Sequence, residues 1–395
     1  MKDKMAKLIE ITEKALSGEW GNDDNTGNGI PVLRTTNFTN EGIVNYNNVV
    51  TRIIEKKKIE EKYLRKGDII IEKSGGSDKQ PVGRVVYFDG PENTYLFNNF
   101  TGLLRVKDQA KWYPRYVFYS LFSNYHRGGT RAFQNKTTGL HNLKIDDFVS
   151  RCEVTEAGIN EQIAVCKQMD RVNDIIRMCQ QQLQKLDELV KARFVEMFGD
   201  PMTDVSKWSA STIGEQFNVA SGGTPATGEK AYWENGTIPW IGSNMCQDTM
   251  LSENDGKFIT EEGYAHSSTK WFHKGTVLVA LVGATIGKTA LLRFDTTTNQ
   301  NIAAIDVTPN AAFSSEFVFY HMQMLYSKFM EIGSGKFKMA NQGFIRQLPL
   351  ICPPMELQEQ FAAFVGQTDK SKVAVQKALD EAQLLFDSLM QKYFG

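Results

Sequence analysis

Two stretches of the chain repeat apolar residues in alternating steps of four and three, the spacing of one seam on a long helix. The first stretch runs from residue 159 to residue 198 without glycine or proline. Gly199, Asp200 and Pro201 then end it, because proline cannot continue a helix. Helices inside a globular domain rarely exceed about 25 residues. The pattern therefore predicts a coiled-coil helix that needs a partner.

The partner of this helix is predicted in the same chain. From residue 356 to residue 395 the spacing returns, although Thr368 and Lys372 make the start of this second seam polar. The two helices begin alike, with residues 161–164 matched to residues 359–362. We therefore expect one antiparallel helical pair. The residues predicted to form its seam are Val165, Met169, Val172, Ile176, Leu183, Leu186 and Val190 in the first helix, and Val375, Leu379, Phe386 and Leu389 in the second.

The stretches before the two helices also resemble each other. Ile-Pro at residues 30–31 returns at 238–239, and Lys-Gly at residues 66–67 returns at 274–275; both pairs are 208 residues apart. This order, domain, long helix, domain, long helix, indicates an internal duplication rather than a solenoid repeat.

Each stretch before a long helix has the pattern of a mixed domain. Short β-branched runs predict strands, at residues 68–72, 82–88 and 94–106 and again at 276–282, 288–294 and 302–307. A helix is predicted after them, over residues 114–125 and 314–330. The fold class is α+β: two similar domains, each a twisted β-sheet with helices, separated by a long antiparallel coiled coil. The predicted borders are 1–158, 159–198, 199–355 and 356–395.

Composition narrows the functional classes. The chain has 395 residues and a net charge of −1, which disfavours binding of nucleic acid by bulk charge but allows local basic patches. Its five cysteines are scattered and form no Cys-x-x-Cys pair, which is typical of a reducing cytosol. The longest apolar run, residues 277–284, is too short to span a membrane. We expect a cytoplasmic protein with no membrane contact.

Motifs for catalysis are weak. The sequence GATIGKT at residues 283–289 places its two glycines four positions apart, whereas a phosphate-binding loop needs five. A glycine turn between two strands is the better interpretation. The sequence CPPM at residues 352–355 lacks the amide and the aromatic residue of an adenine-methyltransferase loop. The five histidines show no metal-ligand spacing.

Two basic loops carry the stronger functional signal. Residues 126–144 contain no acidic residue, and a second loop at the corresponding place carries amides beside its cations. Long cations suit phosphates, while amide side chains can read base edges. One such loop would be interpreted as solvated surface, but two at corresponding places favour contact with DNA. The candidates are Arg127, Arg131 and Lys136 in the first loop, and Lys336, Lys338, Asn341 and Gln342 in the second.

The chain resembles, over its whole length, the specificity subunit of a type I restriction-modification system. The resemblance is carried by IPVLR at residues 30–34, KGDI at 66–69, EKSGGS at 72–77 and PVG at 81–83, then by IPWI at 238–241 and GATIGK at 283–288. Each segment is weak alone, but their order with two long helices is specific. Arg34, Lys73 and Lys288, which lie in these segments, complete the candidate DNA contacts.

The resemblance implies a non-catalytic subunit with two target-recognition domains. Each domain would read one half of a split, asymmetric site in double-stranded DNA. The helices would dock two methyltransferase subunits, which methylate adenine N6, and restriction subunits would join that core in defence against phage. S-adenosylmethionine, ATP and Mg²⁺ are expected only in those partners, so no cofactor and no metal is expected here. Two alternatives stay open: a tandem helical scaffold that binds proteins without reading DNA, and an enzyme using the Gly283 loop for a nucleotide.

Overall fold

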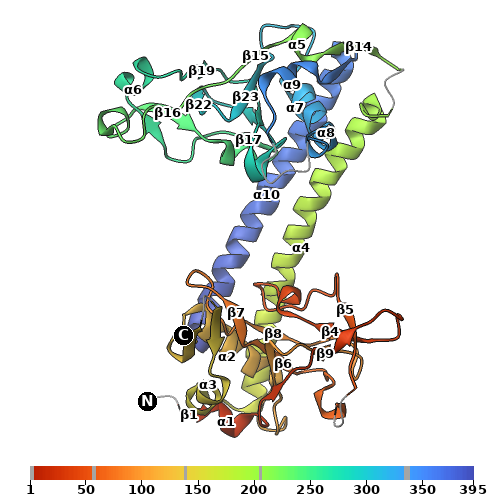
Figure 1. Cartoon of the computed structure of the whole chain (residues 1–395), viewed down its shortest axis with the longest axis vertical. Helices are drawn as coiled ribbons and strands as arrows, with labels where there is room; N and C mark the ends of the chain where they lie inside the picture. Colours follow the sequence, from red (N-terminus) through yellow and green to blue (C-terminus); the bar gives the residue numbers. More distant parts are fainter. Residues whose placement is uncertain (1–3, 56–58, 138–139, 204–206, 333–338) are drawn as a thin grey trace. The chain divides into compact units, whose positions relative to one another are not determined.

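The computed structural model describes residues 4–55, 59–137, 140–203, 207–332 and 339–395. The chain divides into two compact units (Figure 1). The first unit contains Met1–Cys179 together with Ala378–Gly395, and the second unit contains Gln180–Lys377. Each unit therefore includes part of both long helices.

The two long helices are α4 (Ile159–Phe198) and α10 (Met355–Phe394), drawn as unbroken ribbons in Figure 1. All residues predicted to form their seam are buried or half-buried. Burial is deepest toward the helix ends, whereas Leu183, Leu186 and Val375 near the middle are half-buried. The apolar spacing thus marks the face of each helix that is removed from water.

The helices are antiparallel within each unit. In the first unit, Val165 near the start of α4 shares a hydrophobic core with Phe386 near the end of α10. In the second unit, Val190 near the end of α4 shares a core with Phe361 at the start of α10. The start of one helix therefore packs on the end of the other in both units, as predicted.

The polar start of the second seam has partners inside the protein. The Thr368 hydroxyl donates a hydrogen bond to the Phe364 carbonyl at 3.0 Å, and its side chain is buried. The Lys372 ammonium lies 2.6 Å from the Asp187 carboxylate on α4. These contacts let polar side chains occupy seam positions without leaving buried groups unpaired.

The seam departs from the predicted spacing at the end of α10. The sequence pattern continues through Leu389 and Tyr393, but the structure buries Met390 and Phe394 most deeply and leaves the predicted pair half-buried. From Phe386 the buried positions thus follow steps of four, and each such step turns the seam about 40° beyond a full turn. Because of this drift, the end of α10 packs into the core of the first unit. There the centre of the Phe394 ring lies 5.0 Å from that of the Tyr116 ring.

The first unit is built from short strands and small helices around its part of α4. One four-stranded sheet has the order β2-β10-β6-β8, a second has the order β3-β5-β4-β9, a three-stranded sheet has the order β11-β12-β7, and β1 pairs with β13. The elements are β1 (Met5–Lys7), α1 (Leu8–Ile11), β2 (Leu16–Ser17), β3 (Asn22–Asp23), β4 (Ile30–Leu33), β5 (Val50–Ile53), β6 (Ile69–Glu72), β7 (Ser74–Gly76), β8 (Val85–Tyr87), β9 (Leu96–Phe97), β10 (Thr101–Leu104), α2 (Pro114–His126), β11 (Gln134–Thr137), β12 (Leu140–Leu143), α3 (Ile145–Arg151) and β13 (Glu153–Thr155).

The second unit repeats this plan. Its larger sheet has the order β15-β23-β20-β21-β17, a second has the order β18-β16-β22-β19, and β14 pairs with β24. The elements are β14 (Ser209–Thr212), α5 (Ile213–Gln216), β15 (Asn218–Ala220), β16 (Ile238–Ile241), β17 (Thr249–Leu251), β18 (Phe258–Ile259), α6 (Glu261–Ala265), β19 (Trp271–Phe272), β20 (Val277–Ala280), β21 (Thr289–Leu292), β22 (Thr296–Thr298), β23 (Ile302–Asp306), α7 (Ser315–Met324), α8 (Tyr326–Met330), α9 (Gln342–Gln347) and β24 (Pro349–Cys352).

The two units share three arrangements of strands. The order β2-β10-β6-β8 matches β15-β23-β20-β21, the β1–β13 pair matches β14–β24, and the parallel pair β4–β9 matches β16–β22. The α+β fold class and the internal duplication are confirmed. The strands are shorter than predicted: the run at residues 94–106 is two strands, β9 and β10.

The predicted helix over residues 314–330 is also two elements, α7 and α8. Leu325 separates them, with its N–H bonded to the Met322 carbonyl three residues back rather than four. No glycine or proline marks this point in the sequence. Tertiary packing determines it, because the Leu325 side chain is fully buried in the core of the second unit.

A buried glutamine anchors the start of each long helix. The Gln162 side chain accepts a hydrogen bond from the Tyr113 N–H at 2.8 Å and donates to the Lys111 and Ala157 carbonyls. We call this arrangement the glutamine clamp. It fixes the N-terminal end of α2 against α4, because Tyr113 immediately precedes α2.

The second glutamine clamp corrects the predicted alignment of the helix starts. Gln358, not Gln360, accepts from the Ser314 N–H at 2.9 Å and donates to the Ala312 and Pro353 carbonyls. Gln360 is exposed. The helices therefore begin 196 residues apart (Ile159 and Met355), not 198 as the Glu-Gln pairs indicate.

Candidate nucleic-acid interface

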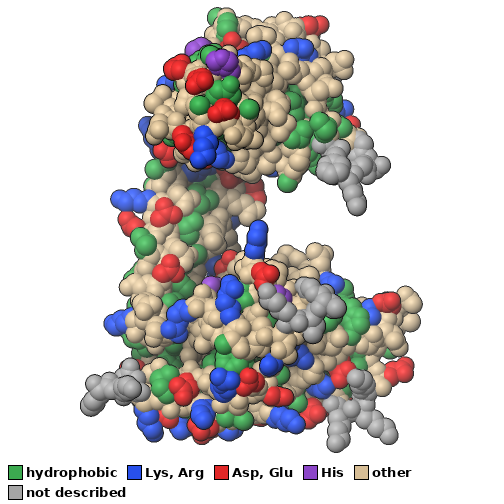
Figure 2. Space-filling model, turned by 60° about the vertical axis from the view of Figure 1, so that its left-hand side comes forward, with side chains coloured by type: hydrophobic (Ala, Val, Ile, Leu, Met, Phe, Trp, Pro, Cys, Tyr) green, Lys and Arg blue, Asp and Glu red, His purple; other side chains and the backbone are tan. Residues whose placement is uncertain are grey.

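Three of the basic residues predicted in the first unit lie on or next to strands of the small sheet β11-β12-β7. Arg131 lies in the turn before β11, Lys136 lies on β11, and Lys73 directly precedes β7. Arg127 caps the C-terminal end of α2 and is exposed. On the face shown in Figure 2, Lys and Arg side chains are interspersed with acidic ones. The positive charge is therefore local, as expected from a net charge of −1.

Lys73 is held in place by the fold. Its ammonium donates a hydrogen bond to the Ser17 hydroxyl at 2.6 Å. Burial lowers the pKa of Lys73, and the nearby Lys62 lowers it further. A cation kept in a partly desolvated position contributes more to an electrostatic interaction than one free in water.

Arg34 lies at the end of β4, where the backbone turns into the short helix Thr35–Asn37. One guanidinium nitrogen donates to the Asn48 carbonyl at 3.2 Å. Its buried Nε has no hydrogen-bond partner within the described residues. Arg34 is half-buried and can present the rest of its guanidinium to a ligand.

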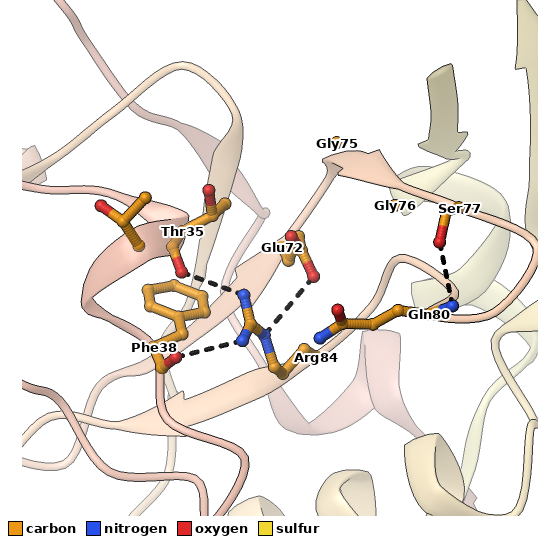
Figure 3. Close-up of a pocket in the computed structure, with 9 residues that line it drawn as sticks. Thr35, Phe38, Glu72, Gly75, Gly76, Ser77, Gln80 and Arg84 are labelled. Atoms are coloured by element: carbon orange, nitrogen blue, oxygen red, sulfur yellow. Dashed lines mark hydrogen bonds and ion pairs between the residues drawn. The ribbon is translucent and has the colours of Figure 1, made fainter. Parts of the chain in front are cut away.

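A polar pocket of about 410 Å³ opens beside β7 in the first unit (Figure 3). Arg84 forms part of its wall and donates to the Phe38 and Thr35 carbonyls at 3.1 and 2.9 Å. Glu72 lies 3.6 Å from the Arg84 Nε. The pocket is lined by Thr35, Thr36, Phe38, Glu72, Gly75, Gly76, Ser77, Gln80 and Arg84.

In the second unit, the residues that follow the predicted loop lie at the corresponding place. In the first unit the Leu143 N–H donates to the Lys73 carbonyl at 2.8 Å, and in the second the Ala340 N–H donates to the Leu281 carbonyl at 2.8 Å. Leu281 therefore corresponds to Lys73. Lys336 and Lys338, the predicted cations of this loop, lie outside the described residues.

Leu281 cannot make the bond that Lys73 makes. The buried hydroxyl of Ser221, the counterpart of Ser17, has no hydrogen-bond partner within the described residues. A pocket of about 470 Å³ opens here. It is lined by Ser221, Gly222, Ser268, Lys270, Leu281, Val282, Gln300, Asn301, Met339, Ala340, Asn341 and Gln342. The same framework thus presents different side chains in the two units.

The two predicted amide readers both have structural contacts. The Asn341 side-chain oxygen accepts the Phe344 N–H at 2.8 Å, which makes Asn341 the N-cap of α9. The Gln342 side-chain oxygen accepts from Arg346 at 3.1 Å. Both residues line the pocket, and their amide nitrogens can still donate to a ligand.

Lys288 is part of an internal ion pair. Its ammonium lies 2.6 Å from the Asp248 carboxylate and 4.9 Å from the centre of the Tyr326 ring. The loop before it contains the short 3₁₀ helix Gly283–Thr285 and links the antiparallel strands β20 and β21, so a strand and not a helix follows it. The geometry is that of a glycine turn between strands, as predicted, and it gives Lys288 a structural contact.

Other chemistry finds little support in the described residues. They contain no group of His, Cys, Asp and Glu that could hold a metal ion. Burial raises the pKa of the Cys152 thiol to about 12 and that of Cys246 to about 12, so neither is an activated nucleophile. No described helix is long and apolar enough to cross a bilayer.

Sequence reasoning missed Glu72, Gln80 and Arg84. The predicted basic loops are stretches rich in cations, whereas this pocket has a carboxylate in its wall. The signal that would have found them is the segment EKSGGSDKQPVGR at residues 72–84, in which polar residues cluster between two predicted strands.

Comparisons with known proteins agree on one family. The model of the type I restriction modification DNA specificity domain matches residues 4–148 and again residues 205–382. The chain is 32% identical over 114 residues to the EcoR124I/EcoR124II specificity subunit of Escherichia coli, an alignment that covers 28% of this chain and 27% of that one. It is 28% identical over 190 residues to the MjaIX specificity subunit of Methanocaldococcus jannaschii, covering 46% and 43%. These alignments span less than half of either relative.

Solved structures share the fold over the full length. A type I restriction-modification S subunit from M. genitalium matches with a TM-score of 0.59 and 16% identity, covering 100% of this chain and 96% of that one. A chain from a structural study of assembly and conformational transition in the type I system matches with a TM-score of 0.55 and 15% identity, covering 100% and 98%. At these identities the likeness concerns the fold alone.

The family model covers most of the chain, and it matches twice, in the order that the internal duplication predicts. The chain therefore belongs to the family of type I restriction-modification specificity subunits, which are non-catalytic components of these systems.

Proposed function

We propose that each unit of this chain reads one half of a split, asymmetric site in double-stranded DNA. The observation that carries this proposal is the contrast between the units at one corresponding place. The first unit holds Lys73 against Ser17, whereas the second has Leu281 beside the unpartnered Ser221 hydroxyl and an open pocket. A shared framework with different recognition surfaces suits two readers of different sequences.

The interfaces combine groups that position DNA with groups that can specify bases. In the first unit Arg127, Arg131 and Lys136 would contact phosphates, with Arg34 and Lys73 beside them. In the second, Lys336 and Lys338 would do so while Asn341 and Gln342 face bases. Phosphate contacts fix the register, and base contacts determine the sequence. The ion pair between Lys288 and Asp248 assigns that lysine a supporting role.

The long helices are proposed to dock two adenine-N6 methyltransferase subunits and, with them, restriction subunits. Apolar side chains outside the seam support this assignment. Ile175 and Met178 on α4, and Leu384 and Leu385 on α10, are exposed in the first unit. Hydrophobic side chains lie among charged ones on the helix surface in Figure 2. S-adenosylmethionine, ATP and Mg²⁺ would act in those partners.

The functional borders stay a proposal. We assign residues 1–158 and 199–355 to the two readers, and the helices between and after them to the docking role. The helical bounds Ile159–Phe198 and Met355–Phe394 support these borders to within one residue.

Binding of the assembled methyltransferase to DNA tests the proposal. The host methylome defines the site, and a gel-shift series over single-base variants of that site measures preference. We expect preference at both halves and none at the spacer between them. A complex that binds all sequences equally would instead support the alternative, a helical scaffold for protein partners without a reading role.

A further inference from the structure

The wall of the pocket beside β7 contains a buried carboxylate whose cationic neighbour is Arg84. The Glu72 side chain is 7% exposed, and one of its oxygens is paired with the Arg84 Nε at 3.6 Å. The other guanidinium nitrogens of Arg84 donate to backbone carbonyls instead. A buried carboxylate is stabilised by donors, so Glu72 has unused capacity to accept a hydrogen bond.

A hydrogen-bonded turn at the rim brings an amide to the same pocket. The Ser77 N–H donates to the Gln80 carbonyl at 2.7 Å, and the Gln80 N–H donates to the Ser77 hydroxyl at 3.1 Å. The Thr130 hydroxyl donates to the Val82 carbonyl at 2.8 Å and fixes the chain beyond the turn. The Gln80 side chain is exposed, lines the pocket and points toward Arg84 in Figure 3. Its amide has no partner among the described residues.

The charges of the pocket select the class of ligand. Glu72 and Arg84 together carry no net charge, so the pocket does not require a further cation. A phosphate would face the Glu72 carboxylate and be repelled. A neutral hydrogen-bond donor can bond to the carboxylate without adding a positive charge and without being repelled. The Gln80 side chain can add one donor and one acceptor.

The surroundings favour a nucleobase as the source of that donor. Gly75 and Gly76 of β7 form one side of the pocket, and β7 belongs to the sheet that carries Lys136. Lys73 directly precedes this strand. The strand that lines the pocket is thus adjacent in sequence to a candidate DNA contact and belongs to the same sheet as a second one. Exocyclic amino groups of cytosine and adenine are the donors that bases present in the major groove, and carboxylates and amides are their usual partners.

We propose that the pocket formed by Glu72 and Gln80 is a base-reading site of the first unit and accepts the exocyclic amino group of a cytosine or an adenine. The inference rests on the proposed reading function and names its chemistry in one half-site. Glu72 accepts from the amino group, Gln80 contacts the adjacent edge of the same base, and Arg84 holds the wall of the pocket.

The test uses the assembled methyltransferase and duplexes that carry single-base variants of its methylome-defined site. Glu72→Gln and Gln80→Ala should each reduce discrimination at the same base pair of one half-site, by roughly tenfold, which is the usual scale for one base contact. An analogue that lacks only the amino group at that base, purine for adenine or 2-pyrimidinone for cytosine, should weaken wild-type binding by a similar factor. It should weaken the Glu72→Gln complex much less.

Two matched controls separate reading from folding. Asp68 is also buried and paired with an arginine, Arg105, at 2.7 Å, but does not line the pocket. Asp68→Asn should lower the melting temperature without changing preference at any position. Gln109, an exposed glutamine of the same unit, should tolerate Gln109→Ala with no effect on either measurement.

Three results would overturn the inference. In the first, the wild-type complex is specific but both pocket variants keep full preference at every position. In the second, the variants lower affinity for all sequences equally. Because Gln80 is exposed, Gln80→Ala decides these cases even if Glu72→Gln does not fold. In the third, the wild-type complex has no sequence preference at all, and the proposed function fails with the pocket assignment.

Discussion

The glutamine clamps show how single side chains set the register of a long helix. Each clamp satisfies one backbone N–H and two carbonyls that would otherwise be buried near the helix start without partners. An unmade hydrogen bond at such a place costs more than a made one contributes. The clamp therefore acts mainly by excluding other registers of the helix against its unit.

Gln358→Ala should destabilise the protein by roughly 1–3 kcal/mol, because it leaves the Ser314 N–H and two carbonyls without partners. Gln360→Ala, two residues away at an exposed position, is the matched control and should change stability by less than about 0.5 kcal/mol. Chemical denaturation followed by circular dichroism measures both. If the two substitutions had equal effects, the hydrogen bonds of Gln358 would contribute no more to stability than an exposed glutamine does.

His321 predicts a dependence of stability on pH. Complete burial lowers the pKa of His321 from 6.5 to about 4, and its ring contacts the Pro349 carbonyl at 2.8 Å. The unfolded chain binds the proton more readily, so this contribution to stability is complete above pH 6.5 and is lost as the pH falls toward 4. The slope is at most about 1.4 kcal/mol per pH unit.

His321→Gln retains a donor for the Pro349 carbonyl but does not titrate. The free energy of unfolding of this variant, measured by denaturation from pH 6.5 to pH 4, should fall less steeply with pH than that of the wild type. The difference in slope corresponds to the one proton that His321 takes up on unfolding. Parallel pH profiles for the two proteins would show that another group is responsible.

At the scale of elements, the polar start of the second seam tests what the helix pair requires. Lys372 lies between apolar positions, and the Asp187 carboxylate that pairs with it is largely exposed. An exposed ion pair contributes little to stability, whereas an apolar residue would continue the seam. The seam therefore tolerates lysine here without depending on it.

Lys372→Leu should accordingly change the free energy of unfolding by less than about 1 kcal/mol. Lys372→Asp places like charges beside Asp187 and Asp369 and should destabilise the pair further, on the order of 1 kcal/mol. Thermal unfolding of the two variants distinguishes them. A strongly destabilised leucine variant would mean that the ion pair, not the apolar seam, holds this segment.

The long helices were predictable because the heptad spacing repeats many times, whereas the strands are often only two to five residues long. The starts of the two long helices were misaligned because two glutamines lie near the start of α10, and only burial distinguishes Gln358 from Gln360. The Glu72 pocket could not be predicted, because it unites three segments that only the fold brings together.

At the scale of the whole molecule, the duplicated design predicts independent readers. Gln80→Ala in the first unit should relax one half-site, and Gln342→Ala in the second should relax the other, each by roughly 1–3 kcal/mol at one base pair. The double variant should show the sum of the two effects within about 0.5 kcal/mol, because effects at sites in separate units that share no partner are additive.

The measurement is the binding of the two single variants and the double variant to a library of duplexes that carry single-base changes in the methylome-defined site. Asn341→Ala is a less selective probe, because loss of the α9 cap would also cost about 1 kcal/mol of stability. If Gln342→Ala relaxes the half-site that Gln80→Ala relaxes, the assignment of one half-site to each unit is wrong.

The composition of the first unit has a consequence for the order of events during protein synthesis. This unit needs Ala378–Gly395 as well as Met1–Cys179, so the whole second unit is translated before the first can close. At about 5–20 residues per second that delay lasts roughly 10–40 s. During it Val165, Met169 and Val172 lack the helix that covers them. The nascent chain therefore exposes an apolar helix face on the ribosome until Ala378–Gly395 emerge, and the first unit closes after the second.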